Sequence, residues 1–209
     1  LEDQIIKSIV VYEPQVKLVE LTYTNYETGE RKVVTELDPE FERAESGIEE
    51  FHWILDPEPM KKQIAIGLQR IEEQKLRAKG RYKPLLFVVT MSIKEAERAQ
   101  KMLVDNFKVK TLLVTEESDE KDREEARKIG SLDSPYDAVV SVLMLREGWD
   151  VREVSTILLL RKFSSPVYGQ QVIGRGLRRI IWDEPEPEIL AVVDHPKLQH
   201  DWLWRLVAV

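Results

Sequence analysis

Short continuous apolar runs alternate along most of this chain with segments in which apolar residues recur at helical spacing. Continuous runs rich in leucine and β-branched residues are typical of strands buried on both faces of a parallel sheet. Five such runs follow residue 84, at 85–90, 111–114, 138–143, 156–160 and 189–193. We therefore expect five buried parallel strands in this part of the chain.

The segments around these runs predict helices. Amphipathic or charged patterns cover residues 60–80, 93–104, 119–129, 167–180 and 196–206. Ser92 is well placed to cap the second of these helices, with Glu95 as its partner in a capping box. Strands that alternate with helices in this way imply right-handed crossovers and a parallel sheet with helices on both faces. The pattern therefore predicts a fold of the α/β class.

The first part of the chain has a different pattern. Residues 5–37 are rich in β-branched residues, and two of their runs flank the turn signal at 25–30, which predicts a β-hairpin. The acidic, weakly patterned stretch at 38–50 favours a loop or a short helix. We expect residues 1–56 to form a β-rich insertion or linker segment and residues 57–209 to form the α/β domain.

Composition narrows the possible classes of protein. The 209 residues are 43% hydrophobic, and the absence of cysteine excludes a disulfide framework and a thiolate zinc site. The scattered histidines do not predict a metal site. Neither a signal peptide nor an apolar run of about 18 residues occurs, so we expect a cytoplasmic protein without a membrane span. Because the chain begins with Leu1, we expect it to be a piece of a longer protein.

The net charge of −7 is unevenly distributed. Residues 1–80 contain 11 basic and 17 acidic residues, whereas residues 81–209 contain 20 and 21. Phosphate binding depends on a local basic patch and not on the net charge of the chain. In residues 81–209 the basic and acidic residues nearly cancel. The overall acidity therefore does not exclude a nucleic acid as a partner.

Polar residues follow three of the predicted strands, at the carboxyl ends where parallel sheets bind their ligands. Thr90 and Ser92 follow the first strand and begin a helix, whose free N–H groups suit a phosphate. Plain N-capping is the alternative for Ser92.

The second place is the turn after the strand at 138–143. Gly148 permits a tight turn there, and Asp150 can accept hydrogen bonds from a ribose hydroxyl or from an arginine. An N-cap or a surface salt bridge is the alternative for Asp150. We expect Trp149 to pack in the core, as most buried aromatic residues do.

The third place is the helix at 167–180. Gln171, Gly174, Arg175 and Arg178 are spaced to share one face of it. Two arginines on one helical face can bind a polyphosphate through paired hydrogen bonds, and Gly174 lets the backbone come close. A solvated surface face is the alternative for arginines at this spacing alone.

The three places resemble the motifs of superfamily 2 helicases. The Gln-x-x-Gly-Arg-x-x-Arg spacing within 170–179 resembles motif VI, residues 144–154 resemble motif V, and residues 85–92 resemble motif IV. The runs Leu-Arg-Glu-Gly-Trp-Asp-Val, Phe-Ser-Ser-Pro and Gln-Val-Ile-Gly-Arg-Gly-Leu-Arg-Arg are most similar to the restriction (Res) subunit of type III restriction-modification enzymes. The resemblance implies that residues 57–209 form a second RecA-like domain.

The resemblance also implies roles in an ATP site. Arg178 looks like the arginine finger that stabilises charge on the γ-phosphate, and Arg175 looks like its companion on the phosphates. Gln171 looks like the residue that links the nucleotide or the attacking water to the finger. Gly174 would let the backbone approach the nucleotide.

The other two motifs imply contacts with the strand. Gly148 and Asp150 look like the motif V positions that couple the ribose side of ATP to the nucleic acid. Thr90 and Ser92 would contact the DNA or RNA backbone.

Several parts of such an enzyme are absent from the sequence. Neither a P-loop, Gly-x-x-x-x-Gly-Lys-Ser/Thr, nor an acidic Walker B strand occurs. The resemblance therefore implies that ATP and Mg²⁺ are shared with an N-terminal RecA-like domain of the same polypeptide, which supplies the Mg²⁺ ligands. We expect this chain to be inactive alone. The family implies DNA as the track, with RNA left open, a modification (methyltransferase) subunit as a partner, and a downstream endonuclease domain.

Two other interpretations stay open. The arginines could belong to a module that binds a nucleotide or nucleic acid without motor activity. The chain could also come from a related helicase of repair or RNA metabolism, which would share the motifs.

Overall fold

The computed structural model describes most of the predicted α/β domain and parts of the segment before it. The described residues are 6–13, 20–24, 31–35, 57–142, 149–163, 166–183, 188–195, 198 and 200–207. Gly148 and the rest of the stretch 143–148 lie outside them, so the predictions made for those positions stay predictions.

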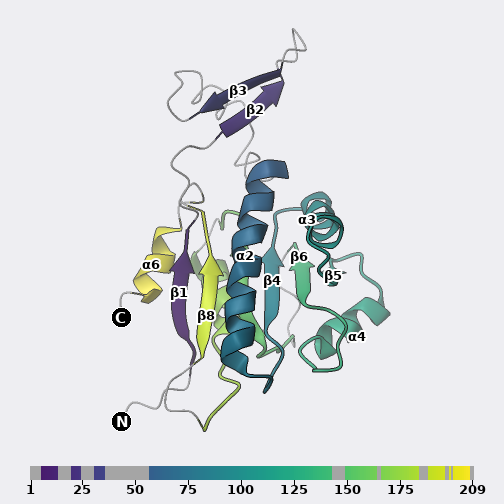
Figure 1. Cartoon of the computed structure of the whole chain (residues 1–209), viewed down its shortest axis with the longest axis vertical. Helices are drawn as coiled ribbons and strands as arrows, with labels where there is room; N and C mark the ends of the chain where they lie inside the picture. The colour runs from purple at the N-terminus through teal and green to yellow at the C-terminus, as the bar shows by residue number, and fades with distance from the viewer. Residues whose placement is uncertain are drawn as a thin grey trace.

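A six-stranded parallel sheet forms the centre of the described structure, in the order β1-β8-β7-β4-β6-β5 (Figure 1). Its strands are β1 (Ser8–Tyr12), β4 (Leu85–Val89), β5 (Thr111–Val114), β6 (Ala138–Ser141), β7 (Val154–Leu159) and β8 (Ile189–Val193). All neighbouring pairs are parallel. The five predicted strands and the α/β class are confirmed.

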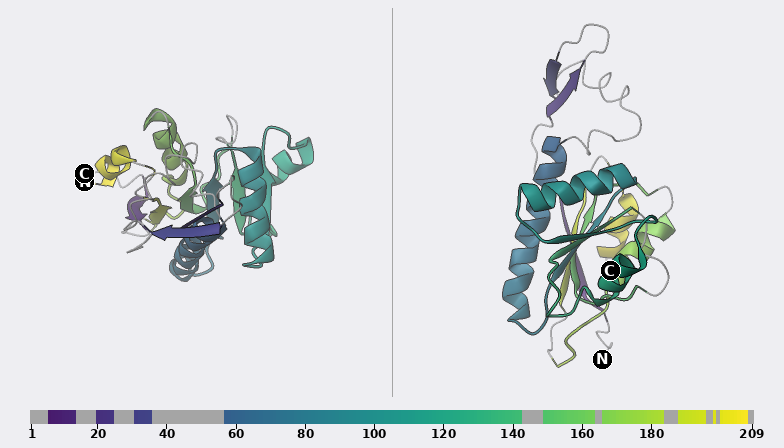
Figure 2. Two further views of the ribbon diagram at one scale, coloured as in Figure 1. Left: turned by 90° about the horizontal axis from the view of Figure 1, so that it is seen from above. Right: turned by 90° about the vertical axis from the view of Figure 1, so that its right-hand side faces the viewer.

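Helices cover both faces of this sheet (Figure 2). They are α2 (Pro57–Ala78), α3 (Ile93–Asp105), α4 (Glu120–Lys128), α5 (Pro166–Gly176) and α6 (Asp201–Val207). The long helix α2 crosses one face and contacts β7, β8 and β4, while α5 contacts β7 from the other side next to α6. No helix among the described residues is both long enough and apolar enough to span a membrane.

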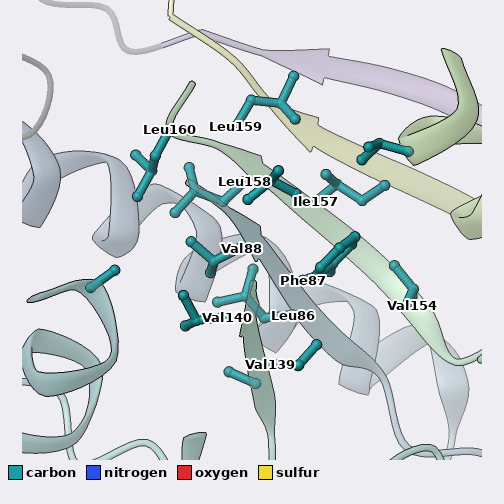
Figure 3. Packing of buried hydrophobic residues seen from close by; sticks show 14 of the residues in the cluster. Leu86, Phe87, Val88, Val139, Val140, Val154, Ile157, Leu158, Leu159 and Leu160 are labelled. Atoms are coloured by element: carbon teal, nitrogen blue, oxygen red, sulfur yellow. The ribbon is translucent and has the colours of Figure 1, made fainter. Parts of the chain in front are cut away.

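The core lies where the central strands meet the two helical layers (Figure 3). Every residue of β4 and of β7 is buried, because each strand has neighbours on both sides. Helices α2 and α5 pack on β7, while α2 packs on β4 and the Trp149 ring lies against Phe87. Phe87, Val140 and Leu158 represent the three central strands in this cluster. Their continuous apolar sequence is thus explained by burial on both faces.

Strand β1 corrects the predicted domain boundary. Ser8 pairs with Ile189 and Tyr12 with Val193, so β1 is an edge strand of the main sheet. The assignment of all of residues 1–56 to an insertion is therefore wrong for residues 8–12. Local patterning could not reveal this, because a β-branched run has the same appearance in a hairpin and at a sheet edge.

The predicted hairpin is confirmed and lies after β1 in the chain. It consists of β2 (Glu20–Thr24) and β3 (Arg31–Thr35), which pair antiparallel. In Figure 1 the two strands lie apart from the main sheet, beyond its carboxyl ends. The hairpin thus interrupts the connection between β1 and α2.

Helix α5 ends earlier than its sequence pattern predicts. It stops at Gly176 and not at Ile180. Beyond it, the main chain turns to meet the segment before β1: the Lys7 N–H donates to the Leu177 carbonyl at 2.7 Å, and Ile6 forms an antiparallel bridge with Arg178. A contact between residues far apart in the sequence therefore replaces the last helical turn.

Candidate functional site

Helix α5 brings the predicted arginines to the amino ends of the strands. The helix starts after the carboxyl end of β7 and its 11 residues span about 16 Å at 1.5 Å per residue. Arg178 pairs with Ile6, two residues before β1 begins, and Asp150 lies four residues before β7 begins. The expectation that the arginines gather at the carboxyl edge of the sheet is wrong, because it ignored the length of this helix.

Two consecutive residues hold the two arginines. Arg175 Nη1 donates to the main-chain carbonyl of Trp149 at 2.5 Å. Arg178 Nη1 forms an ion pair with Asp150 Oδ1. About half of each side chain of this pair is exposed, at 53% for Arg178 and 47% for Asp150. Of the two hydrogen-bonding partners that the sequence suggested for Asp150, the structure contains the arginine.

The electrostatics of the arginine pair favour an anion. Burial, followed by the neighbouring charge of Arg178, lowers the pKa of Arg175 from its ordinary value, and Asp150 opposes this change. An arginine nevertheless stays protonated at neutral pH. Among the described residues, the carboxylate of Asp150 lies close to both guanidinium groups, by an ion pair with Arg178 and by its charge at Arg175. Two positive charges therefore face one negative charge in the described part of this half-exposed site.

Trp149 anchors this segment to the body of the domain. The residue is 5% exposed, and its ring centroid lies 5.2 Å from that of Phe87 in β4. Its Nε1 donates to the Ala126 carbonyl in α4 at 2.8 Å. The expected packing role is confirmed, and this anchoring fixes the carbonyl that holds Arg175.

Gly174 and Gln171 lie on the exposed side of α5. Within the described part of the chain, a Cβ atom built on Gly174 would have no neighbouring heavy atom within 4 Å, and the residue has ordinary helical backbone. Packing among the described residues therefore does not require a glycine there. The open space beside Arg175 is compatible with the close approach of a ligand that the sequence predicts.

Thr90 and Ser92 lie at the opposite edge of the sheet, beyond the carboxyl end of β4. Thr90 is fully buried, and its hydroxyl donates to the carbonyl of Ser92 at 3.3 Å and lies 3.5 Å from that of Ser141. It offers no exposed surface to a nucleic-acid strand in this structure. Ser92 caps α3 as predicted, because its Oγ accepts from the Glu95 N–H at 3.4 Å.

Three charged residues beneath the arginine pair were not predicted from the sequence. Lys7 is 1% exposed and Arg179 is 5% exposed. Arg179 Nε lies 3.4 Å from Glu188 Oε2. The other oxygen of Glu188 accepts from the N–H groups of Ile180 at 2.8 Å and of Ile181 at 2.6 Å.

These hydrogen bonds keep Glu188 charged. Burial works against its carboxylate, but main-chain hydrogen bonds at Ile181, Glu188 and Ile180, together with the charge of Lys7, lower its pKa below the ordinary value. A lysine inside a β-branched run is the one sequence signal that could have pointed to this buried cluster, because lysine is seldom fully buried.

The described residues contain no group of three or more histidine, cysteine, aspartate or glutamate side chains that could hold a metal ion. The buried His200 instead has a structural setting. Its Nδ1 lies 2.9 Å from Asp194 Oδ1, and its Nε2 accepts from the Phe163 N–H at 3.2 Å. This links the segment after β7 to the end of β8.

The chain is similar to several solved structures, whereas no family model and no curated protein matches it. Mss116p DEAD-box helicase domain 2 bound to an RNA duplex is 14% identical over 65% of this chain and 51% of its own, with a TM-score of 0.47. The C-terminal part of the Fun30 ATPase domain is 8% identical over 70% of this chain and 45% of its own, with a TM-score of 0.47.

A third similar structure is the C-terminal domain of the Sulfolobus solfataricus SWI2/SNF2 ATPase. It is 8% identical over 70% of this chain and 55% of its own, with a TM-score of 0.44. The match thus spans about half the length of each of these three structures.

Proposed function

We propose that this chain is the second RecA-like motor domain of an ATP-dependent helicase or translocase of superfamily 2. Arg178 and Arg175 would complete an ATP site whose P-loop and Mg²⁺ ligands belong to an N-terminal domain of the same polypeptide. The observation that carries the proposal is the pairing of the two motif VI arginines with Trp149 and Asp150 of motif V at one exposed edge.

The properties of this edge fit a triphosphate. A guanidinium group offers a planar fork of donors that matches phosphate oxygens, and two of them lie together here. The Arg178–Asp150 pair is half exposed, and such pairs contribute about 0–1 kcal/mol. Exchanging the carboxylate for a phosphate therefore costs little.

Each residue would have a distinct part in the reaction. Bound ATP supplies the phosphoryl group that is transferred to water. Arg178 would stabilise the charge that develops on the γ-phosphate, and Arg175 would bind a neighbouring phosphate oxygen. Gln171, on the exposed side of α5, would orient the water or the finger, and the open space at Gly174 would admit the nucleotide.

The finer assignment rests on the sequence alone. We propose DNA as the track and a Res-like subunit of a type III restriction-modification system as the whole protein, because the motif V and VI runs are most similar to that family. Ser92, at the carboxyl edge, is the better candidate for a contact with the strand, since Thr90 is buried.

The test is DNA-stimulated ATP hydrolysis by the full-length polypeptide. We expect Arg178→Ala to lower kcat by about a thousandfold or more while ATP still binds, because the finger acts mainly on the transition state. Arg178→Lys should retain a measurable part of the turnover, since it keeps the charge and loses the fork.

The matched control is Arg127→Ala. Arg127 is also an exposed, ion-paired arginine, 3.2 Å from Glu120 on α4, and its loss should leave kcat unchanged. Turnover of Arg178→Ala equal to that of the wild type would contradict the finger assignment. Robust turnover by this chain alone would contradict a shared ATP site.

A further inference from the structure

The main chain before β1 is part of the arginine site. Ile6 bridges to Arg178, and the Lys7 N–H donates to the carbonyl of Leu177 at 2.7 Å. These contacts hold the segment that leaves α5 and carries Arg178. One side of the site is therefore fixed by residues from the other end of the chain.

The side chain of Lys7 reaches the other side of the same site. Its Nζ donates to the carbonyl of Arg152 at 2.5 Å and to that of Val154 at 2.8 Å. These acceptors follow Trp149 and Asp150, the residues that hold the two arginines. One residue thus ties together the two segments that form the site.

The burial of Lys7 is unfavourable for stability alone. Lys7 is 1% exposed, and removing an ammonium group from water costs free energy that an apolar side chain would not lose. Glu188 and Glu153 compensate part of this cost through their charges. What an apolar residue cannot supply is a pair of directed hydrogen bonds to two carbonyls of the 152–154 segment.

We propose that Lys7 is a positioning residue for the arginine pair. It sets the spacing between the 149–154 segment and the 177–178 segment, so that Arg175 and Arg178 face the same ligand. This inference rests on the proposed function for the role of the arginines, and it adds a residue that lies outside the three motifs.

The first test needs no nucleotide. Amide hydrogen exchange is measured on the full-length polypeptide with Lys7→Met, which keeps the apolar stem and removes the donors. We expect faster exchange in 149–154 and 177–181 and unchanged exchange in β4. The matched control is Lys83→Met, which removes a lysine that donates to the Ser134 carbonyl at 2.7 Å and lies 3.3 Å from Asp137. Unchanged exchange in both segments of the Lys7 variant would overturn the inference.

The second test separates positioning from general stability. In the same polypeptide, Lys7→Met should lower kcat about tenfold or more with little change in KM for ATP, because small displacements of catalytic groups are costly. In an Arg178→Lys background the same substitution should have a smaller effect, since Lys7 acts by placing the guanidinium group of Arg178 relative to Arg175 and that group is already lost. Lys83→Met should leave kcat unchanged in both backgrounds.

The outcomes are distinguishable. If Arg178→Ala leaves turnover intact, the proposed function fails. If Arg178→Ala abolishes turnover but Lys7→Met keeps the wild-type kcat, or loses the same factor in both backgrounds, the positioning role alone is overturned. If Lys7→Met does not fold, Lys7→Gln replaces it, because glutamine retains a donor of shorter reach. Its kcat is then compared in the wild-type and Arg178→Lys backgrounds in the same way.

Discussion

Arg178 and Lys7 are both cations at the amino edge of the sheet, but their surroundings give them different properties. Arg178 is half exposed and paired with one carboxylate, so its contact with Asp150 is weak and exchangeable. Lys7 is buried and bound to two main-chain carbonyls, so its contacts are fixed by the fold. The exposed Arg178 is therefore suited to binding a ligand, whereas the buried Lys7 is suited to holding the segments that carry the arginine pair.

The pH dependence of stability should report the burial of Lys7. Burial lowers its pKa from 10.5 to about 8, with Glu188 and Glu153 opposing. Between pH 8 and 10.5 the unfolded chain therefore binds more protons at this site than the folded one. The free energy of unfolding of the wild type should rise across that range relative to Lys7→Met, by up to about 3 kcal/mol, and the difference should be constant below pH 7.

Urea denaturation of both proteins at pH 7, 8, 9 and 10 measures this difference. Subtracting the Lys7→Met curve removes the contribution of the other titrating groups. If the free energies of unfolding of the two proteins change with pH in parallel, folding does not shift the pKa of Lys7.

Two glycines of helix α5, Gly174 and Gly176, have different surroundings. A Cβ atom on Gly176 would lie 2.7 Å from Leu190 Cδ1 and 3.2 Å from Ile157 Cδ1, so this glycine lets the helix pack closely on β8 and β7. A Cβ atom on Gly174 would have no heavy atom of the described residues within 4 Å. Packing against described residues explains the first glycine, whereas the second lies on the exposed side of α5, next to Arg175.

Alanine substitutions should separate the two glycines. Gly176→Ala should lower the free energy of unfolding by about 1–3 kcal/mol, because it overpacks a buried contact. Gly174→Ala should leave stability unchanged or raise it by up to about 1 kcal/mol, because alanine favours the helix. Urea denaturation of both variants measures these changes. Under the proposed function, Gly174→Ala in the full-length polypeptide should also raise KM for ATP, because the added methyl group enters the space proposed for the nucleotide. Equal losses of stability would contradict the packing described for α5.

At the scale of the whole molecule, the main sheet is assembled from two separated parts of the chain. Strand β1 precedes the hairpin and pairs with β8, while the remaining strands follow α2. The same N-terminal segment carries Lys7 and pairs with Arg178. A domain beginning at residue 57 would therefore lack the edge strand β1, and it would also lack Ile6 and Lys7, which contact the segments that carry the arginine pair.

Two shortened proteins test this organisation. A chain that begins at residue 57 should unfold at a lower temperature than the wild type or aggregate, because it exposes the edge of β8. A chain in which a Gly/Ser linker replaces residues 14–56 should keep the melting temperature, since β1 remains. Thermal unfolding compares them, and equal stability of the two would contradict the role of β1.

The sequence by itself determined the strands, the class of fold and the candidate residues. The buried strands follow from continuous apolar runs, and the Ser92 cap follows from residues only three apart. These are local properties, so they can be derived without knowing how distant segments meet. The hairpin was predictable for the same reason.

Only the tertiary structure decided where these elements lie relative to one another. The place of β1 in the sheet, the early end of α5 and the position of the arginines at the amino edge all depend on contacts between residues far apart in the chain. Lys7 is the clearest case, since its carbonyl partners are about 145 residues away. A local pattern carries no information about such partners, because pairing energy depends on which surfaces the folded chain brings together.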